Sequence, residues 1–107
     1  MTDATVEARE AEPGRLEIAV AGEVDLANAT FVEQRVQDLI TNRARSVVLD
    51  LGGLDCLDSA GIRALFTLAN RLELLQVELE VVLPTDSPVR KAVELVGLGE
   101  VVPVRIV

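Results

Sequence analysis

The residues best suited to chemistry lie in one short stretch, LDCLDSAGIRALF, which runs from Leu54 to Phe66. In it Ser59 follows an aspartate and precedes an alanine–glycine step, where an apolar run gives way to a helical pattern. A hydroxyl in this place has three possible uses. It can act as a nucleophile, it can cap the helix, or it can accept a group that another protein transfers to it.

Catalysis by this chain alone is poorly supported. The sequence has no histidine, so it cannot assemble a Ser-His-Asp relay, and LDSAG lacks the first glycine of a G-x-S-x-G turn. The only lysine, Lys91, belongs to a different predicted helix. One thiol, Cys56, leaves zinc without its usual ligands. Although Asp50, Asp55 and Asp58 are chemically suited to Mg²⁺, Asp50 falls inside an apolar strand. We therefore expect no enzyme activity, no metal and no cofactor.

Composition narrows the class of protein further. The 107 residues are 50% hydrophobic with a net charge of −8, which predicts one folded domain over residues 1–107 and argues against binding nucleic acid. No apolar run approaches the roughly 18 residues of a membrane span, and the acidic start does not resemble a secretory leader. We expect a cytoplasmic protein without membrane contact. Cys56 is expected to be a small core residue.

Hydrophobic periodicity predicts an α/β domain with a mixed, largely parallel sheet of four to five strands. The expected strands cover 4–9, 15–21, 46–51, 77–83 and 101–104, and the expected helices cover 27–42, 60–75 and 89–98. Right-handed crossovers would place the loops after the strands 15–21 and 46–51 at the same edge of the sheet. That edge would gather the polar residues Glu23, Asp25, Asp55, Asp58 and Ser59.

The helix start at Ser59 contains two good capping residues. Asp58 and Ser59 both have side chains that accept backbone N–H bonds, and no Glu or Gln three residues later decides between them. If Ser59 is the cap, its role is structural. If Asp58 is the cap, the hydroxyl is spare, and a phosphate added there would bring roughly −1.5 to −2 charges to a surface made for the unmodified loop.

Four stretches resemble the STAS domain, and specifically the bacterial anti-sigma factor antagonists. They are AGEVDLANA (21–29), VVLDLGGLDCLDSAGIRAL (47–65), VVLPTDSPVRKAVELVGL (81–98) and VVPV (101–104), which cover most of residues 15–104 in the family's order. The resemblance implies that the helices pack mainly on one face of the sheet. It also implies a regulator that binds an anti-sigma factor with a histidine-kinase-like ATPase fold, thereby releasing a sigma factor.

In the family that anti-sigma factor also phosphorylates the serine after the aspartate, here Ser59, and a serine phosphatase reverses the reaction. The resemblance places Asp25 and Asp58 at the partner contact. Around Ser59 we expect the partner-binding surface to include Ala60, Gly61, Arg63, Ala64 and Thr67.

The sequence departs from the family where Ala60 replaces a frequent second serine, which leaves Ser59 as the only acceptor in the motif. Arg63 is equally well explained as plain solvated surface. Other STAS modules act without a phospho-switch, as constitutive scaffolds or in lipid transport, and this remains the main alternative. A nucleotide-binding or hydrolytic protein using the acidic loop is the third hypothesis.

Overall fold

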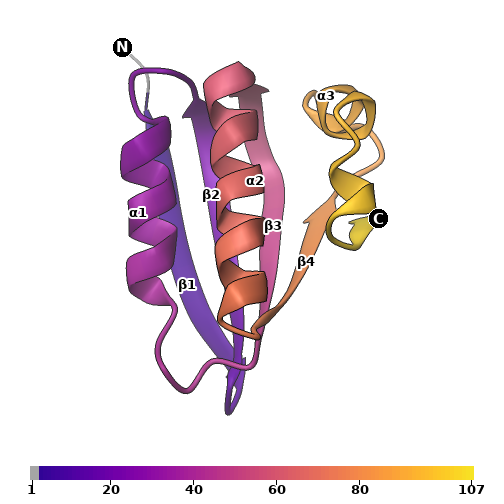
Figure 1. Ribbon diagram of the computed structural model, residues 1–107. Helices are drawn as coiled ribbons and strands as arrows, with labels where there is room; N and C mark the ends of the chain where they lie inside the picture. Colours follow the sequence, from indigo (N-terminus) through magenta and orange to yellow (C-terminus); the bar gives the residue numbers. More distant parts are fainter. Residues whose placement is uncertain (1–2) are drawn as a thin grey trace.

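The computed structural model describes residues 3–107, and its elements alternate as the sequence predicts (Figure 1). In chain order they are β1 (Ala4–Glu12), β2 (Arg15–Val24), α1 (Ala29–Leu39), β3 (Ser46–Leu57), α2 (Ser59–Leu74), β4 (Glu78–Leu83), α3 (Arg90–Leu95), the 3₁₀ turn η1 (Leu98–Glu100) and β5 (Val104–Ile106).

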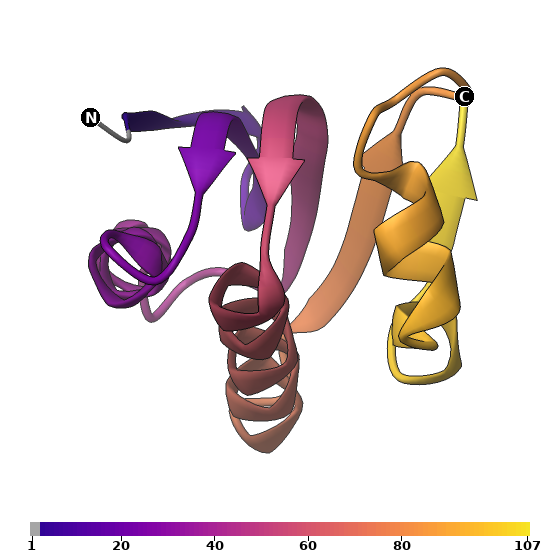
Figure 2. The ribbon, with the colours of Figure 1, turned by 90° about the horizontal axis from the view of Figure 1, so that it is seen from above.

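The five strands form one sheet in the order β1-β2-β3-β4-β5. β1 pairs with β2 in antiparallel fashion, and the other three pairs are parallel. Seen from above, α1 and α2 lie side by side against one face of the sheet (Figure 2). The predicted α/β class, the mixed and largely parallel sheet, and the helices on one face are confirmed.

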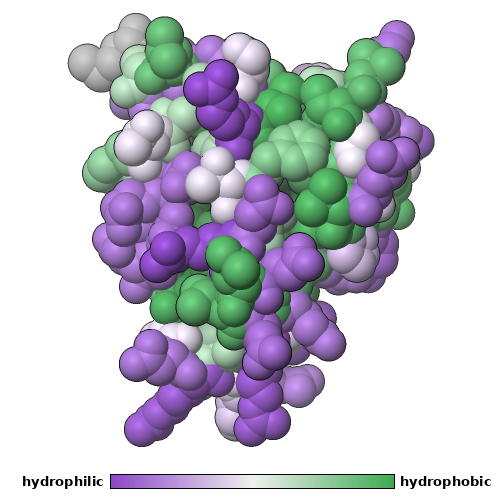
Figure 3. All heavy atoms as spheres, viewed as in Figure 1, coloured by the Kyte–Doolittle hydropathy of each residue, from purple (hydrophilic) through white to green (hydrophobic). Residues whose placement is uncertain are grey.

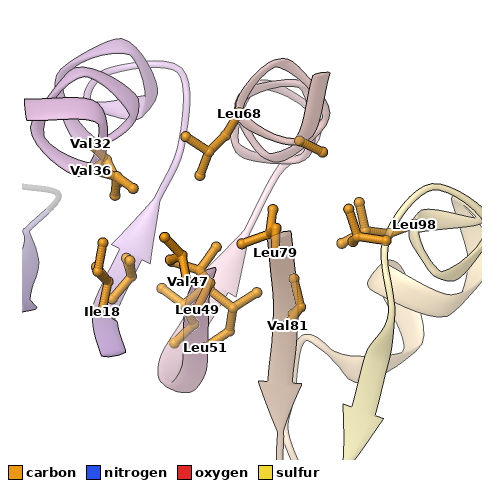
Figure 4. Packing of buried hydrophobic residues seen from close by; sticks show 14 of the residues in the cluster. Ile18, Val32, Val36, Val47, Leu49, Leu51, Leu68, Leu79, Val81 and Leu98 are labelled. Atoms are coloured by element: carbon orange, nitrogen blue, oxygen red, sulfur yellow. The ribbon is translucent and has the colours of Figure 1, made fainter. Parts of the chain in front are cut away.

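The core is built from the side chains of the central strands that face the helices. On β3 the side chains of Val47, Leu49 and Leu51 point toward the helices, and they pack between α2 and the neighbouring strands (Figure 4). On β4 and η1, Leu79 and Leu98 continue the same layer. This layer is purely aliphatic, because the described residues bury no polar or charged side chain in it. The sequence contains only two phenylalanines and no tyrosine or tryptophan.

In the described part of the chain no helix covers the opposite face of the sheet (Figure 2), and this face is largely polar, with Val48 as a buried exception. Ion pairs between exposed side chains join Arg9 to Glu17 and Arg105 to Glu80 across neighbouring strands. This polar face and the apolar face together fix the register, since a slip by one residue would exchange them.

The strand whose length differs most from the sequence prediction is β3, which we expected to end at residue 51. It continues past Gly52 and Gly53 to Leu57, because its pairing with β2 resumes after two register shifts and reaches Val24. Gly53 fits there because a Cβ at that position would lie 2.7 Å from the Cβ of Ala21 on the neighbouring strand.

The predicted bounds of the third helix and of the last strand were wrong. The third helix ends at Leu95 instead of residue 98, because Gly97 adopts a left-handed conformation with φ 74° and turns the chain into η1. The last strand covers Val104–Ile106 rather than 101–104, since Val101 and Val102 still follow η1 and Pro103 has no N–H to donate.

Two expectations about burial also need correction. Cys56 is exposed, because the outer end of β3 turns it away from the core. On α2 the apolar pattern predicts a buried face of Ile62, Leu65, Phe66, Ala69 and Leu72. Ala69 and Leu72 are buried, together with Gly61 and Leu68, whereas Ile62, Leu65 and Phe66 are only half-buried. The buried face of α2 is therefore displaced from the predicted one toward Gly61 and Leu68.

Truncating Leu49, which is 1% exposed, should lower the free energy of unfolding by about 2–5 kcal/mol, because Leu49→Ala leaves a cavity in a close-packed aliphatic layer. Leu74→Ala removes the same atoms at a position that is 85% exposed, and its effect should stay within about 0.5 kcal/mol. Urea denaturation of both variants measures the difference. Equal stability losses would contradict the assigned core.

Candidate functional site at the carboxyl ends of β2 and β3

The ends of two neighbouring parallel strands bring the candidate residues together. β2 ends at Val24 and β3 at Leu57, and these two residues are paired. The backbone N–H of Asp58 donates to the carbonyl of Val24 at 3.2 Å. The loop between β2 and α1 therefore lies beside the start of α2, as the sequence analysis predicts, and Figure 2 shows both strand ends leading into their helices at this edge.

Asp58 is the residue that joins the two loops. Its Oδ1 accepts hydrogen bonds from the backbone N–H groups of Ala60 at 2.9 Å and Gly61 at 3.1 Å, which makes Asp58 the N-cap of α2. Its Oδ2 accepts a hydrogen bond at 3.1 Å from the backbone N–H of Leu26, which lies in the loop between β2 and α1. The choice between two caps that the sequence left open is thus decided for Asp58.

Ser59 is the first residue of α2 and is exposed to solvent. Within residues 3–107 no hydrogen-bond partner is assigned to its hydroxyl, since Asp58 alone caps the helix. The positive end of the helix dipole lies under it. The hydroxyl is consequently accessible to an incoming active site.

The loop between β2 and α1 is held by its own side chains. Asp25 Oδ1 accepts the N–H of Ala27 at 2.9 Å, and the N–H of Asp25 donates to Asn28 Oδ1 at 3.0 Å. The side-chain amide of Asn28 donates to the carbonyl of Glu23 at 2.9 Å. These bonds stabilise a tight turn, so Asp25 shapes the loop as well as contributing charge to it.

Sequence reasoning missed one residue of this edge. Leu26 lies between Asp25 and Ala27 at the turn, and it is 84% exposed although it is large and apolar. A bulky aliphatic side chain inside an otherwise polar turn, DLAN, is the signal that would have found it.

The other expected contact residues divide into two groups. Arg63 and Thr67 are exposed and follow Ser59 at intervals of one helical turn, so the three form a ridge along α2. Ala60 and Ala64 are half-buried and pack against the core from the same helix.

Gly61 is buried and lies below this ridge. A Cβ on Gly61 would come within 2.5 Å of Leu57 Cδ1 and 3.1 Å of the carbonyl oxygen of Val24. Its role is therefore to let α2 approach the ends of β2 and β3, which keeps Ser59 beside the neighbouring loop.

Among residues 3–107, no three acidic or cysteine side chains come together as metal ligands would. No helix in that range is long and apolar enough to cross a membrane. Asp50, considered above as a magnesium ligand, accepts the backbone N–H of Gly52 at 2.8 Å on the outer face of the sheet.

The fold and this edge together define a small α/β domain with an accessible hydroxyl at a helix start. The chain belongs to the STAS domain family, whose sequence model matches residues 6–106. A Bordetella bronchiseptica protein named as an anti-sigma factor antagonist, BtrV, is 36% identical over 91 residues, which are 85% of this chain and 78% of the relative.

Two solved structures have a similar fold. An anti-sigma factor antagonist from Mycobacterium paratuberculosis superposes with a TM-score of 0.82 at 23% identity, covering 96% of this chain and 86% of that one. The Bacillus cell fate determinant SpoIIAA, in its phosphorylated form, gives 0.64 at 18% identity, covering 94% and 90%. At these identities the two structures establish the shared fold.

Asp58→Ala should lower the free energy of unfolding by about 0.5–2 kcal/mol, because it removes the N-cap of α2. Ser59→Ala should change it by less than about 0.5 kcal/mol, since that exposed hydroxyl does not cap the helix. Urea denaturation of the two variants provides the comparison. A larger loss from Ser59→Ala than from Asp58→Ala would mean that Ser59 has the structural role.

Proposed function

We propose that this chain is an anti-sigma factor antagonist controlled by phosphorylation of Ser59. The unmodified form binds an anti-sigma factor with a histidine-kinase-like ATPase fold, and this releases a sigma factor in the cytoplasm. The observation that best supports the proposal is the exposed Ser59 hydroxyl, left over at a helix start that Asp58 already caps. The 36% identity to a protein named as an antagonist supports the class of partner.

The anti-sigma factor is also the kinase in this proposal. It supplies ATP and Mg²⁺, and the Ser59 oxygen attacks the γ-phosphorus while the bond to the leaving ADP breaks. The hydroxyl proton passes to a base of the kinase or to water, because this chain has no histidine to receive it. A separate serine phosphatase then hydrolyses the phosphoester and restores the hydroxyl.

Phosphorylation acts through charge. The new group brings roughly −1.5 to −2 charges to an edge that already holds Asp58 and, across the paired strand ends, Asp25. A partner surface that fits the neutral hydroxyl then meets an anion with its hydration shell. A loss of about 3 kcal/mol in binding free energy weakens association roughly a hundredfold, which is enough to exchange partners without refolding.

The ridge of Ser59, Arg63 and Thr67 is the surface that we assign to the partner, together with the half-buried Ala60 and Ala64 beside it. Gly61 supports this surface from below, and Asp25 and Asp58 border it. A constitutive scaffold would use the same fold without depending on the charge at residue 59, and this difference separates the two hypotheses.

The test uses each histidine-kinase-like anti-sigma ATPase encoded in the source genome, purified and incubated with this chain, ATP and Mg²⁺. One of them should add a single phosphate, located at Ser59 by mass spectrometry, and Ser59→Ala should abolish it. In the absence of ATP, Ser59→Glu should weaken binding to the same ATPase by about a hundredfold in calorimetry, while Ser59→Ala should bind like the wild type.

Thr41→Glu adds the same charge at an exposed position beyond the far end of α1, and its binding should match the wild type. If Ser59→Glu also binds like the wild type, the chain is a constitutive module and the switch is excluded. ATP turnover by the purified chain alone would favour the third hypothesis, a hydrolytic protein.

A further inference from the structure

We propose that Leu26 is an apolar anchor for the partner and that Asp58 holds it in place beside Ser59 through its second carboxylate oxygen. The inference rests on the proposed function, because it names a contact residue for the same partner. It goes beyond that proposal by adding a residue from another loop and by giving Asp58 a positioning role.

The exposure of Leu26 is the first observation. Its side chain is 84% exposed in a turn whose neighbours are polar or small. A single exposed leucine is ordinary on a protein surface, and Leu74 at the end of α2 is 85% exposed as well. Exposure alone therefore does not distinguish the two leucines.

The backbone of Leu26 is fixed, and this is the second observation. Its N–H donates to Asp58 Oδ2, and the flanking turn is closed by the Asp25–Ala27 and Asn28–Glu23 bonds. An apolar side chain on an already ordered backbone loses little backbone freedom when it enters a pocket, so a smaller part of its contact energy is offset by ordering.

The third observation is that Asp58 uses both carboxylate oxygens. One caps α2 immediately before Ser59, and the other accepts the N–H of Leu26. A single side chain thus sets the spacing between the modifiable hydroxyl and the leucine. An asparagine can keep the cap through its one oxygen, but its NH₂ group cannot accept the N–H of Leu26.

These features describe the partner surface. It needs an apolar pocket of leucine size next to the place where Ser59 is received. Glu23 and Asp55 are exposed near the ends of β2 and β3 at this edge, and the whole chain carries a net charge of −8. A pocket with basic residues at its rim therefore matches it best. The kinase of the proposed function is the partner that has to receive the unmodified Ser59.

The binding test compares two leucines with matched exposure. Leu26→Ala should weaken binding of the unmodified chain to the ATPase found above by about tenfold to a hundredfold, because a leucine buried on binding is lost. Leu74→Ala should bind like the wild type. Both variants should keep the wild-type unfolding midpoint, since neither side chain is packed in the core.

The positioning role of Asp58 is tested by coupling. Asp58→Asn should weaken binding in the wild-type background but have little further effect in Leu26→Ala, because both changes act on the same contact. Additive losses would show that Asp58 does not act through Leu26.

A measurement without the partner tests the hydrogen bond itself. In Asp58→Asn the amide of Leu26 should exchange with solvent roughly tenfold faster by NMR. The amide of Gly52, which donates to the carboxylate of Asp50, should be unchanged and serves as the control. An unchanged exchange rate at Leu26 would overturn the positioning role.

The outcomes separate this inference from the proposed function. If Ser59→Glu weakens binding but Leu26→Ala and Leu74→Ala both bind like the wild type, the anchor is wrong and the switch stands. If Leu26→Ala weakens binding and Ser59→Glu does not, the anchor stands and the switch is wrong. If no ATPase of the set binds the chain, both proposals are overturned.

Discussion

Three backbone N–H groups, two from the first turn of α2 and one from the loop after β2, converge on the carboxylate of Asp58. This arrangement holds the edge of the domain together. It accepts hydrogen bonds from two backbone N–H groups in the first turn of α2, and it connects the turn after β2 to that helix start. The neighbouring hydroxyl of Ser59 is therefore not needed as a cap. A carboxylate suits this place because it only accepts hydrogen bonds and offers two oxygens on opposite sides.

The sheet makes that convergence possible. Because β2 and β3 are parallel neighbours, both strands end at the same edge, and their pairing extends to Val24 and Leu57. The buried Gly61 then allows α2 to lie close to the strand ends. The backbone N–H of Asp58 donates to the carbonyl of Val24, which holds Asp58 beside the loop that carries Leu26.

Polar and apolar residues are distributed so that stability depends on the core and binding depends on the surface. Among the described residues the interior is an aliphatic layer without buried polar or charged side chains, and its close packing stabilises the fold (Figure 4). On the face seen in Figure 3, apolar residues gather in patches in the upper and middle parts, and hydrophilic residues dominate the lower part. A phosphate added at an exposed helix start therefore changes the surface charge without disturbing the core, which suits a module that exchanges partners.

The sequence by itself determined the α/β class, the order of the elements and the edge at which Asp25, Asp58 and Ser59 meet. Alternation in the strands and helical spacing in between are local patterns, and the crossover rule converts them into a shared edge. Only the tertiary structure decided that Asp58 is the cap, that β3 continues to Leu57 and that Leu26 is held beside Ser59. These features depend on strand pairing and on a hydrogen bond between residues 32 positions apart, and no local pattern encodes such a contact.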